Sequence, residues 1–132
     1  MAILESNSIR SSSSSFNSPV QFLTSGGTEN GTLCRAWVSF NGQGTVAGRA
    51  DFNVNTVSDN GTGLYTVNFS NSMSDANYCA MVSPGNNAGG SQGAWCTIYD
   101  DATTLSGSCR VVTYSSAGSF QDTEQVFFAV FR

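Results

Sequence analysis

The side chains of this sequence that could act as acids, bases or nucleophiles are few. There is no histidine, which removes the commonest general base, and no lysine, which removes Schiff-base chemistry. Asp100 and Asp101 are adjacent, so in an extended chain they point to opposite sides. Asp122 and Glu124 are two residues apart and share a face, as glycosidase carboxylates must, but AGSFQDTEQV is typical of an exposed loop before a strand. We therefore expect no catalytic residue and no enzyme activity.

Metal chemistry is also poorly supported. The cysteines stand at 34, 79, 96 and 109, too far apart for the close ligand pairs of structural zinc. They could form two disulfides, but strand-like apolar surroundings favour reduced, buried thiols in a reducing compartment. A calcium ion at Asp100, Asp101 or Asp122 is conceivable. We expect no metal and no cofactor.

The stretch VSDNGTGLYTVNF (57–69) could cradle an ion with its side-chain oxygens or simply reverse the chain. It lacks the further acidic ligands and terminal glutamate of an EF-hand loop. Asn60 and Gly61 both tolerate positive φ, so Asn-Gly between two strands is a strong hairpin signal. The stretch therefore predicts a turn in the loop DNGTG (59–63).

Composition limits the partners. The chain has 132 residues, 39% hydrophobic and only 11% charged, which suits one modest core and a surface of hydroxyl and amide groups. The net charge is −4 and the five arginines are scattered, so nucleic acid and anionic membrane are excluded as expected partners. The N-terminal MAILESNSIR is unlike a secretory signal, and no apolar run approaches the length of a membrane span.

Two regions differ in composition. Residues 1–32 are serine-rich with isolated apolar positions, which predicts a flexible arm or an arm that orders against a partner. Residues 33–132 carry short β-branched and aromatic runs between turn residues, which predicts one antiparallel β-sandwich, jelly-roll-like. The expected strands are LCRAWVSF, TVAGRADF, NVNTVS, LYTVNF, NYCAMVS, GAWCTIY, SCRVVTY and QVFFAVF.

Residues 34–81 carry the motifs CRAWV, GTV, SDNGTG, YTVNF and DANY in order. In this order and spacing they resemble a recurrent module of tailed bacteriophages, of the marine or cyanophage type, found near the C-terminal end of tail-fibre and tail-associated chains. The resemblance covers about a third of the chain, and Gly48 and Asp51 depart from its pattern. It implies a compact β-domain, usually a homotrimer, assembled in the bacterial cytoplasm and displayed on the virion.

We place the trimer interface at two arginines and their aromatic neighbours. Arg35 and Arg49 lie in strand-like runs beside Trp37 and Phe52. A buried arginine stacked on an aromatic ring, and paired with Asp51 or a neighbouring chain, would be structural. An exposed one could instead stack on a sugar.

The glycine-rich loop SPGNNAGGSQGAW (83–95) is the candidate recognition site. Its polar side chains match sugar hydroxyls, and its tryptophan could be a stacking platform unless it turns inward to begin a core strand. Tyr114 could join the same apex. The candidate receptor-binding residues are Asn86, Asn87, Ser91, Gln92, Trp95 and Tyr99.

The resemblance, with which these features agree, implies a virion structural protein. We expect a short tail-fibre or tail-tip head that associates with itself and contacts the host, for which a surface glycan is a candidate ligand. Residues 1–32 would attach it to other tail or capsid proteins. The alternative is a capsid decoration protein, in which the arm is the functional part.

Overall fold

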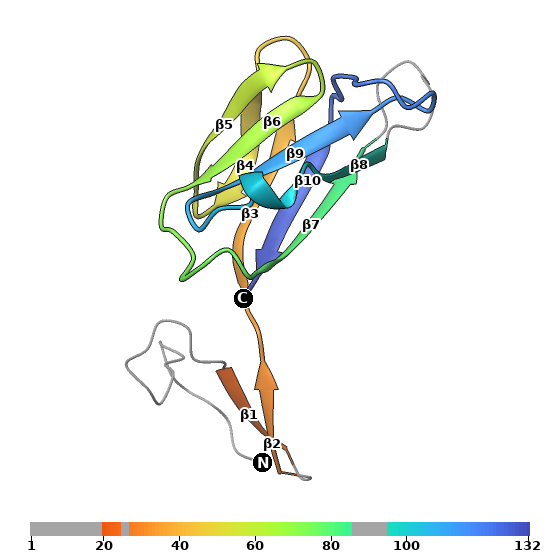
Figure 1. Ribbon diagram of the computed structural model, residues 1–132. Helices are drawn as coiled ribbons and strands as arrows, with labels where there is room; N and C mark the ends of the chain where they lie inside the picture. Colours follow the sequence, from red (N-terminus) through yellow and green to blue (C-terminus); the bar gives the residue numbers. More distant parts are fainter. Residues whose placement is uncertain (1–19, 25–26, 86–94) are drawn as a thin grey trace. The chain divides into compact units, whose positions relative to one another are not determined.

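The computed structural model describes residues 20–24, 27–85 and 95–132 (Figure 1). The chain divides into two compact units, Met1–Leu33 and Cys34–Arg132. Every strand pair is antiparallel, and the helical structure of the described part is one 3₁₀ turn, η1 (Asp101–Thr103). None of its helices is long and apolar enough to cross a membrane. The all-β prediction is confirmed.

The first unit contains a β-hairpin that the sequence did not predict. β1 (Val20–Thr24) pairs with β2 (Gly27–Gly31) in a register that places Val20 opposite Gly31. The strand GTENG is dominated by glycine, glutamate and asparagine, which are depleted in strands, so propensity gave no signal for it. Whether residues 1–32 attach the chain to a partner stays a prediction.

The second unit is built from two four-stranded sheets that face each other as layers (Figure 1). Sheet I has the order β4-β3-β10-β7, and sheet II has the order β5-β6-β9-β8. All eight strands predicted from residue 33 onward are present. They are β3 (Cys34–Asn41), β4 (Ala47–Phe52), β5 (Val54–Gly61), β6 (Leu64–Phe69), β7 (Cys79–Pro84), β8 (Trp95–Ile98), β9 (Ser108–Tyr114) and β10 (Val126–Phe131).

The core lies between the sheets and follows the period-2 alternation of the central strands. The inward side chains are almost all apolar and fully or nearly fully buried. Phe40 and Tyr65 meet edge to face across the layers, with ring centroids 5.2 Å apart. The core positions of β3, β10, β6 and β9 are Ala36, Val38, Phe40, Val126, Phe128, Val130, Tyr65, Val67, Phe69, Cys109 and Val111.

The chain passes from sheet I to sheet II at Asn53, which separates β4 from β5. Asn53 has a φ of 56°, in the left-handed region that asparagine tolerates better than most residues. Its side chain donates to the carbonyls of Arg35 and Asn71, both at 3.0 Å, and its oxygen accepts the Asn71 N–H at 2.8 Å. One asparagine thus holds the corner between the sheets.

The 57–69 stretch is a hairpin, as predicted, and its turn lies at the end of the predicted loop 59–63. β5 continues through Gly61, which pairs with Leu64, and Thr62–Gly63 form the turn. The register shifts at Asn60, whose side-chain oxygen accepts a hydrogen bond from the Thr66 hydroxyl at 2.6 Å. The Asn-Gly pair thus precedes the turn instead of forming it, because a bulge at Asn60 absorbs one residue there.

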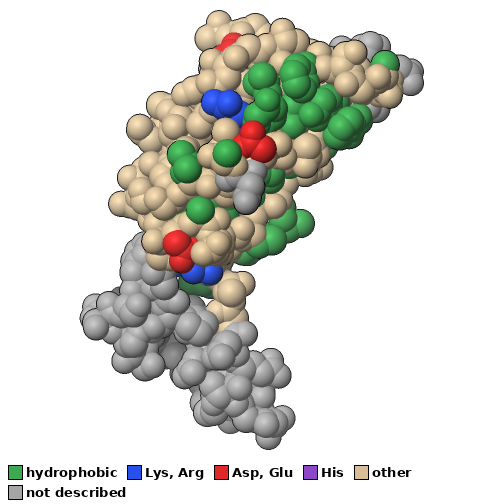
Figure 2. Space-filling model, in the orientation of Figure 1, with side chains coloured by type: hydrophobic (Ala, Val, Ile, Leu, Met, Phe, Trp, Pro, Cys, Tyr) green, Lys and Arg blue, Asp and Glu red, His purple; other side chains and the backbone are tan. Residues whose placement is uncertain are grey.

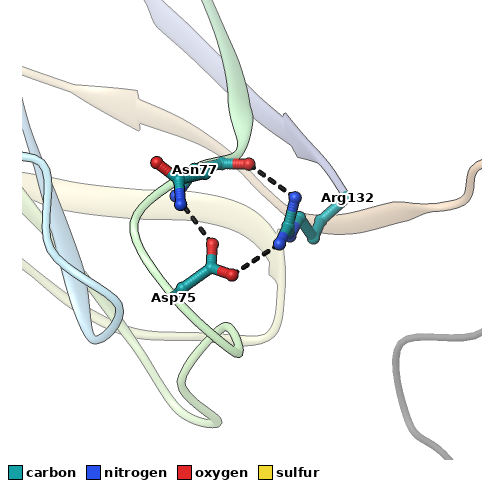
Figure 3. Close-up of polar contacts among 3 residues, drawn as sticks. All are labelled: Asp75, Asn77 and Arg132. Carbon is teal, nitrogen blue, oxygen red and sulfur yellow. Dashed lines mark hydrogen bonds and ion pairs between the residues drawn. The ribbon is translucent and has the colours of Figure 1, made fainter.

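The DANY motif closes one end of the sandwich (Figure 3). Asp75 accepts the Asn77 N–H at 2.7 Å and forms an ion pair with Arg132 at 2.5 Å. Arg132 also donates to the Asn77 carbonyl at 2.8 Å, so the loop before β7 is tied to the residue after β10. The Tyr78 hydroxyl lies 3.0 Å from the Leu105 carbonyl oxygen. The motif therefore has a structural role here.

Candidate functional site

Three aromatic side chains form a cluster on the outward face of sheet II. Trp95 on β8 and Tyr114 on β9 are opposite each other, and their rings stack with centroids 4.0 Å apart and planes 14° from parallel. Phe120, from the loop after β9, lies 5.2 Å from the Tyr114 ring. Trp95 is 47% exposed and Phe120 is comparably exposed. We call Trp95, Tyr114 and Phe120 the aromatic cluster.

Figure 2 shows hydrophobic side chains gathered over the C-terminal end of β9 and the neighbouring β8. Cross-strand aromatic pairs stabilise a sheet, but a pair on a solvated face also offers large, rigid, partly wet rings to a ligand. Val112, which precedes Tyr114 by two residues on the same face, is fully buried. The strand surface next to the cluster is therefore closed to solvent at Val112.

The structure decides the alternative left open for Trp95. Cys109 and Val111 of the partner strand β9 face the core, so Tyr114 and the opposite Trp95 point outward and do not join the core. Tyr99 also is exposed. Four further candidate residues, Asn86, Asn87, Ser91 and Gln92, lie outside the described residues.

Arg110 is a residue of this face that the sequence analysis missed. It lies on β9, and its backbone carbonyl accepts the Tyr99 N–H at 2.9 Å. Its guanidinium carbon is 5.7 Å from the centre of the Tyr99 ring, a cation–π distance. The sequence could have shown this from the alternation in SCRVVTY: Cys109 and Val111 are inward positions, so Arg110 between them must face outward.

The rest of sheet II's outward face is polar. The Asn68 amide donates to the Thr56 and Ser58 hydroxyls, each at 3.0 Å, across β5 and β6. Thr66 lies directly opposite Arg110 on the neighbouring strand. Hydroxyl and amide groups thus border the arginine on one side, with aromatic rings on the other.

Sheet I presents a very different outward face. In one row across the sheet, Phe52 is opposite Trp37, Trp37 is opposite Ala129, and Ala129 is opposite Met81. Phe127 lies in the next row. The exposed fractions of the large side chains are 39% for Trp37, 55% for Phe52, 61% for Met81 and 44% for Phe127. We call these four residues the apolar face.

The apolar face is hollowed rather than flat. A shallow groove of about 550 Å³ runs over β3, β10 and β7 and is lined by Trp37, Met81 and Phe127 among others. Trp37 and Phe52 are the residues of this face that the sequence places at an interface, whereas Met81 and Phe127 are predicted only as strand residues. The run VFFAVF is apolar at every position, so its alternation carries no information on which side faces out.

The two arginines predicted at the trimer interface, Arg35 and Arg49, lie in different environments. Arg49 forms an ion pair with Glu124 at 3.8 Å, rather than with Asp51. Arg35 lies at the irregularity between β3 and β10, where Cys34 and Ala36 pair with consecutive residues. Half-buried Arg35 and exposed Arg49 therefore do not share one position on the sheet, and their assignment to an oligomer interface stays a prediction.

Asp122 and Glu124 are held in structural contacts. The Oδ1 of Asp122 accepts the Gly63 N–H at 2.7 Å and the Tyr65 hydroxyl at 3.0 Å. Burial, and next the charge of Asp122, raise the pKa of Tyr65, which keeps the phenol protonated as a donor. Both carboxylates are half-buried, so the prediction that they are exposed turn residues is wrong. Their contacts explain why a polar pair stands before the last strand.

The four cysteines are free. Cys109 is fully buried, as predicted, and burial raises the pKa of its thiol. Cys34 and Cys96 are only half-buried, and Cys79 is exposed, which corrects the prediction of buried thiols. Cys34 and Cys79 pair with Phe131 from opposite sides of β10, so their backbones are about 9–10 Å apart, beyond disulfide reach.

Two of the aspartates considered for a cation accept hydrogen bonds within the chain. Asp59 accepts the Gly61 N–H at 2.9 Å, and Asp100 accepts both the backbone N–H and the hydroxyl of Thr103 at 2.8 Å. In the part of the chain that the structure covers, no three His, Cys, Asp or Glu side chains group as metal ligands.

Comparison of the chain with protein-family models, curated proteins and solved structures finds no match in any of the three. The functional argument therefore depends on the two outward faces of the sandwich and on the sequence resemblance of residues 34–81.

Proposed function

We propose that the chain is a structural protein of a tailed-bacteriophage particle, in which the sandwich is a trimeric head domain that contacts the host surface. The resemblance of residues 34–81 to tail-fibre modules supports this assignment. The observation that carries it is the apolar face of sheet I. An antiparallel sheet that faces water normally alternates apolar inward positions with polar outward ones, and sheet I does not.

The size of the apolar face fits an association surface. Side chains of this kind have about 150–250 Å² each, so the exposed fractions of the four residues correspond to roughly 400 Å². Apolar patches of about 300–600 Å² on a single chain are often functional, and a standard interface buries about 800 Å² per partner. The apolar face would supply half of such an interface.

The two faces of a sandwich point in opposite directions, so association through sheet I leaves the aromatic cluster on sheet II accessible. Three copies would then present three recognition surfaces, and multivalency would turn weak single contacts into strong attachment. As a finer description of the head we propose a jelly-roll-like arrangement. It is supported by the pairing of the first strand, β3, with the last, β10.

Sedimentation of the full chain tests the association. We expect a trimer, and we expect Trp37→Ser with Phe127→Ser to yield monomers, because both changes remove buried apolar area from the interface. Trp95→Ala is the matched control, since it removes an exposed tryptophan from sheet II and leaves the trimer intact. A wild-type chain that sediments as a monomer would contradict the proposal.

Capsid decoration is the second candidate, and the separate N-terminal unit favours it. In the first unit, β1 and β2 pair with each other as a hairpin, as expected of an attachment segment. Gold-labelled antibody against residues 33–132 on intact particles distinguishes the two: label at the tail supports host contact, and label over the capsid supports decoration. Particles without label would overturn both assignments.

A further inference from the structure

We propose that the outward face of sheet II binds an acidic saccharide, with Arg110 holding a carboxylate and the aromatic cluster holding a sugar ring. The inference rests on the proposed host contact and names the class of ligand that would be recognised there. Three observations support it: the guanidinium of Arg110 is unpaired among the described residues, the aromatic cluster lies at a suitable distance from it, and polar side chains lie nearby.

Arg110 has no counter-ion among the residues that the structure describes. Arg49 and Arg132 form ion pairs with Glu124 and Asp75, whereas the guanidinium of Arg110 forms no hydrogen bond or ion pair with any residue that the structure describes. Its Nε is buried and has no partner. The terminal nitrogens are not among the buried atoms, so they stay accessible. A carboxylate would supply the paired acceptors that the guanidinium fork lacks.

The spacing suits a short oligosaccharide. Arg110 and Tyr114 are four residues apart on the same face of β9, which is about 13–14 Å along an extended strand. Between them Val112 is fully buried and lies opposite Thr97, whose side chain is exposed. A saccharide lying along β9 would therefore meet a cation, a hydroxyl and two aromatic rings in succession.

Polar groups on the neighbouring strand complete the match to a sugar. The Thr66 hydroxyl donates to Asn60 at 2.6 Å, which leaves its oxygen lone pairs free to accept from a sugar hydroxyl. Beyond it lie the Thr56, Ser58 and Asn68 side chains. Such a mixture of rigid rings and few polar groups is typical of a site that fixes the orientation of a small ligand.

Other anionic ligands fit this face less well. A nucleic acid needs several cations along its phosphates, and Arg110 stands alone among polar and aromatic side chains. An acidic peptide could pair with Arg110, but extended peptides usually add to a sheet edge or fill an apolar groove, and Arg110 lies on β9 in the interior of sheet II. The carboxylate of Asp100, the residue after Tyr99, accepts a hydrogen bond from the Thr103 N–H.

Calorimetric titration of the full chain tests the inference. The probes are trigalacturonate, triglucuronate and sialyllactose, each beside its methyl ester, which keeps the shape and removes the charge. We expect at least one acid to bind tenfold or more tightly than its ester. Arg110→Gln should abolish that preference without changing ester binding, and Trp95→Ala should weaken both forms. Arg49→Gln is the control, since it removes the same charge from sheet I.

Three results would overturn the inference: no acid preferred over its ester, a preference that survives Arg110→Gln, or equal binding of a tetraglutamate peptide. Attachment of the trimer to host cells separates this failure from that of the proposed function. If Trp95→Ala abolishes attachment but no acidic saccharide binds, only the ligand class is wrong. If attachment is unchanged by Trp95→Ala and Arg110→Gln together, host contact through sheet II is wrong.

Discussion

Asp122 should act as a structural acceptor, and a double-mutant cycle with Tyr65 can measure this. Tyr65 is fully buried, and its hydroxyl lies 3.0 Å from Asp122 Oδ1 and 2.9 Å from the Gly42 carbonyl oxygen. The same Oδ1 accepts the Gly63 N–H. One carboxylate oxygen therefore joins β6 and the 62–63 turn to the segment before β10.

The size of the effect follows from these bonds. Tyr65→Phe removes one hydrogen bond to a charged group, which is worth about 1.5–3 kcal/mol of unfolding free energy. Asp122→Ala leaves the buried Gly63 N–H unsatisfied, at a cost of about 1–3 kcal/mol, and removes the charged acceptor of Tyr65, which keeps only the Gly42 carbonyl, so we expect a loss of about 3–4 kcal/mol. Because the two changes delete one shared interaction, the double variant should lose about 1–2 kcal/mol less than their sum.

Urea unfolding at one fixed protein concentration is the assay, because stability of an associating chain depends on concentration. Asp122→Asn is the matched control: it keeps an acceptor oxygen and removes the charge, so it should cost less than Asp122→Ala. A coupling below about 0.3 kcal/mol would refute the structural role. Asp122 would then be free for chemistry, and its pairing with Glu124 as glycosidase-like carboxylates would have to be tested again.

The remaining predictions concern the turn, the thiols and the C-terminal ion pair. Gly63→Ala should cost more than about 3 kcal/mol in urea unfolding, because φ is 68° and a Cβ would lie 2.5 Å from a backbone oxygen of β9; Gly118→Ala, at φ 81° with open space, should cost about 1 kcal/mol. Burial raises the pKa of Cys96 from 9.0 to about 11, so its contribution to stability is present below pH 9 and lost between pH 9 and 11, as unfolding at successive pH values should show. Iodoacetamide at pH 8 should modify exposed Cys79 before Cys96, as mass spectrometry of peptides can report. Arg132→Gln should lower stability by about 0.5–1 kcal/mol, because its ion pair is partly exposed, and an unchanged midpoint would show that the pair contributes nothing.

Much of the fold could be predicted because it is local. Period-2 alternation in LYTVNF and CRAWVSF, bounded by glycine and asparagine turns, identifies strands without any knowledge of their partners. The exact position of the turn, Thr62–Gly63, could not be predicted in this way, because the bulge at Asn60 depends on the register with β6. The β1–β2 hairpin was missed because its second strand lacks strand-forming residues.

The candidate site was only partly predictable. Trp95 and Tyr99 were found from their type and from the loop before them, and the structure places both outward. Arg110 was missed because an isolated arginine in a strand resembles any solvated cation. It becomes notable only when the structure shows Tyr99 beside it and, among the described residues, no carboxylate paired with it.

By itself the sequence determined that residues 33–132 form eight short antiparallel strands around one core and that their surface depends on hydroxyl and amide groups. These properties follow from residue type and spacing along the chain. Only the tertiary structure decided which apolar side chains are left outside, because strands such as VFFAVF are apolar on both faces and the partner sheet covers just one of them. It also decided the role of Asp122, whose partner Gly63 is 59 residues away.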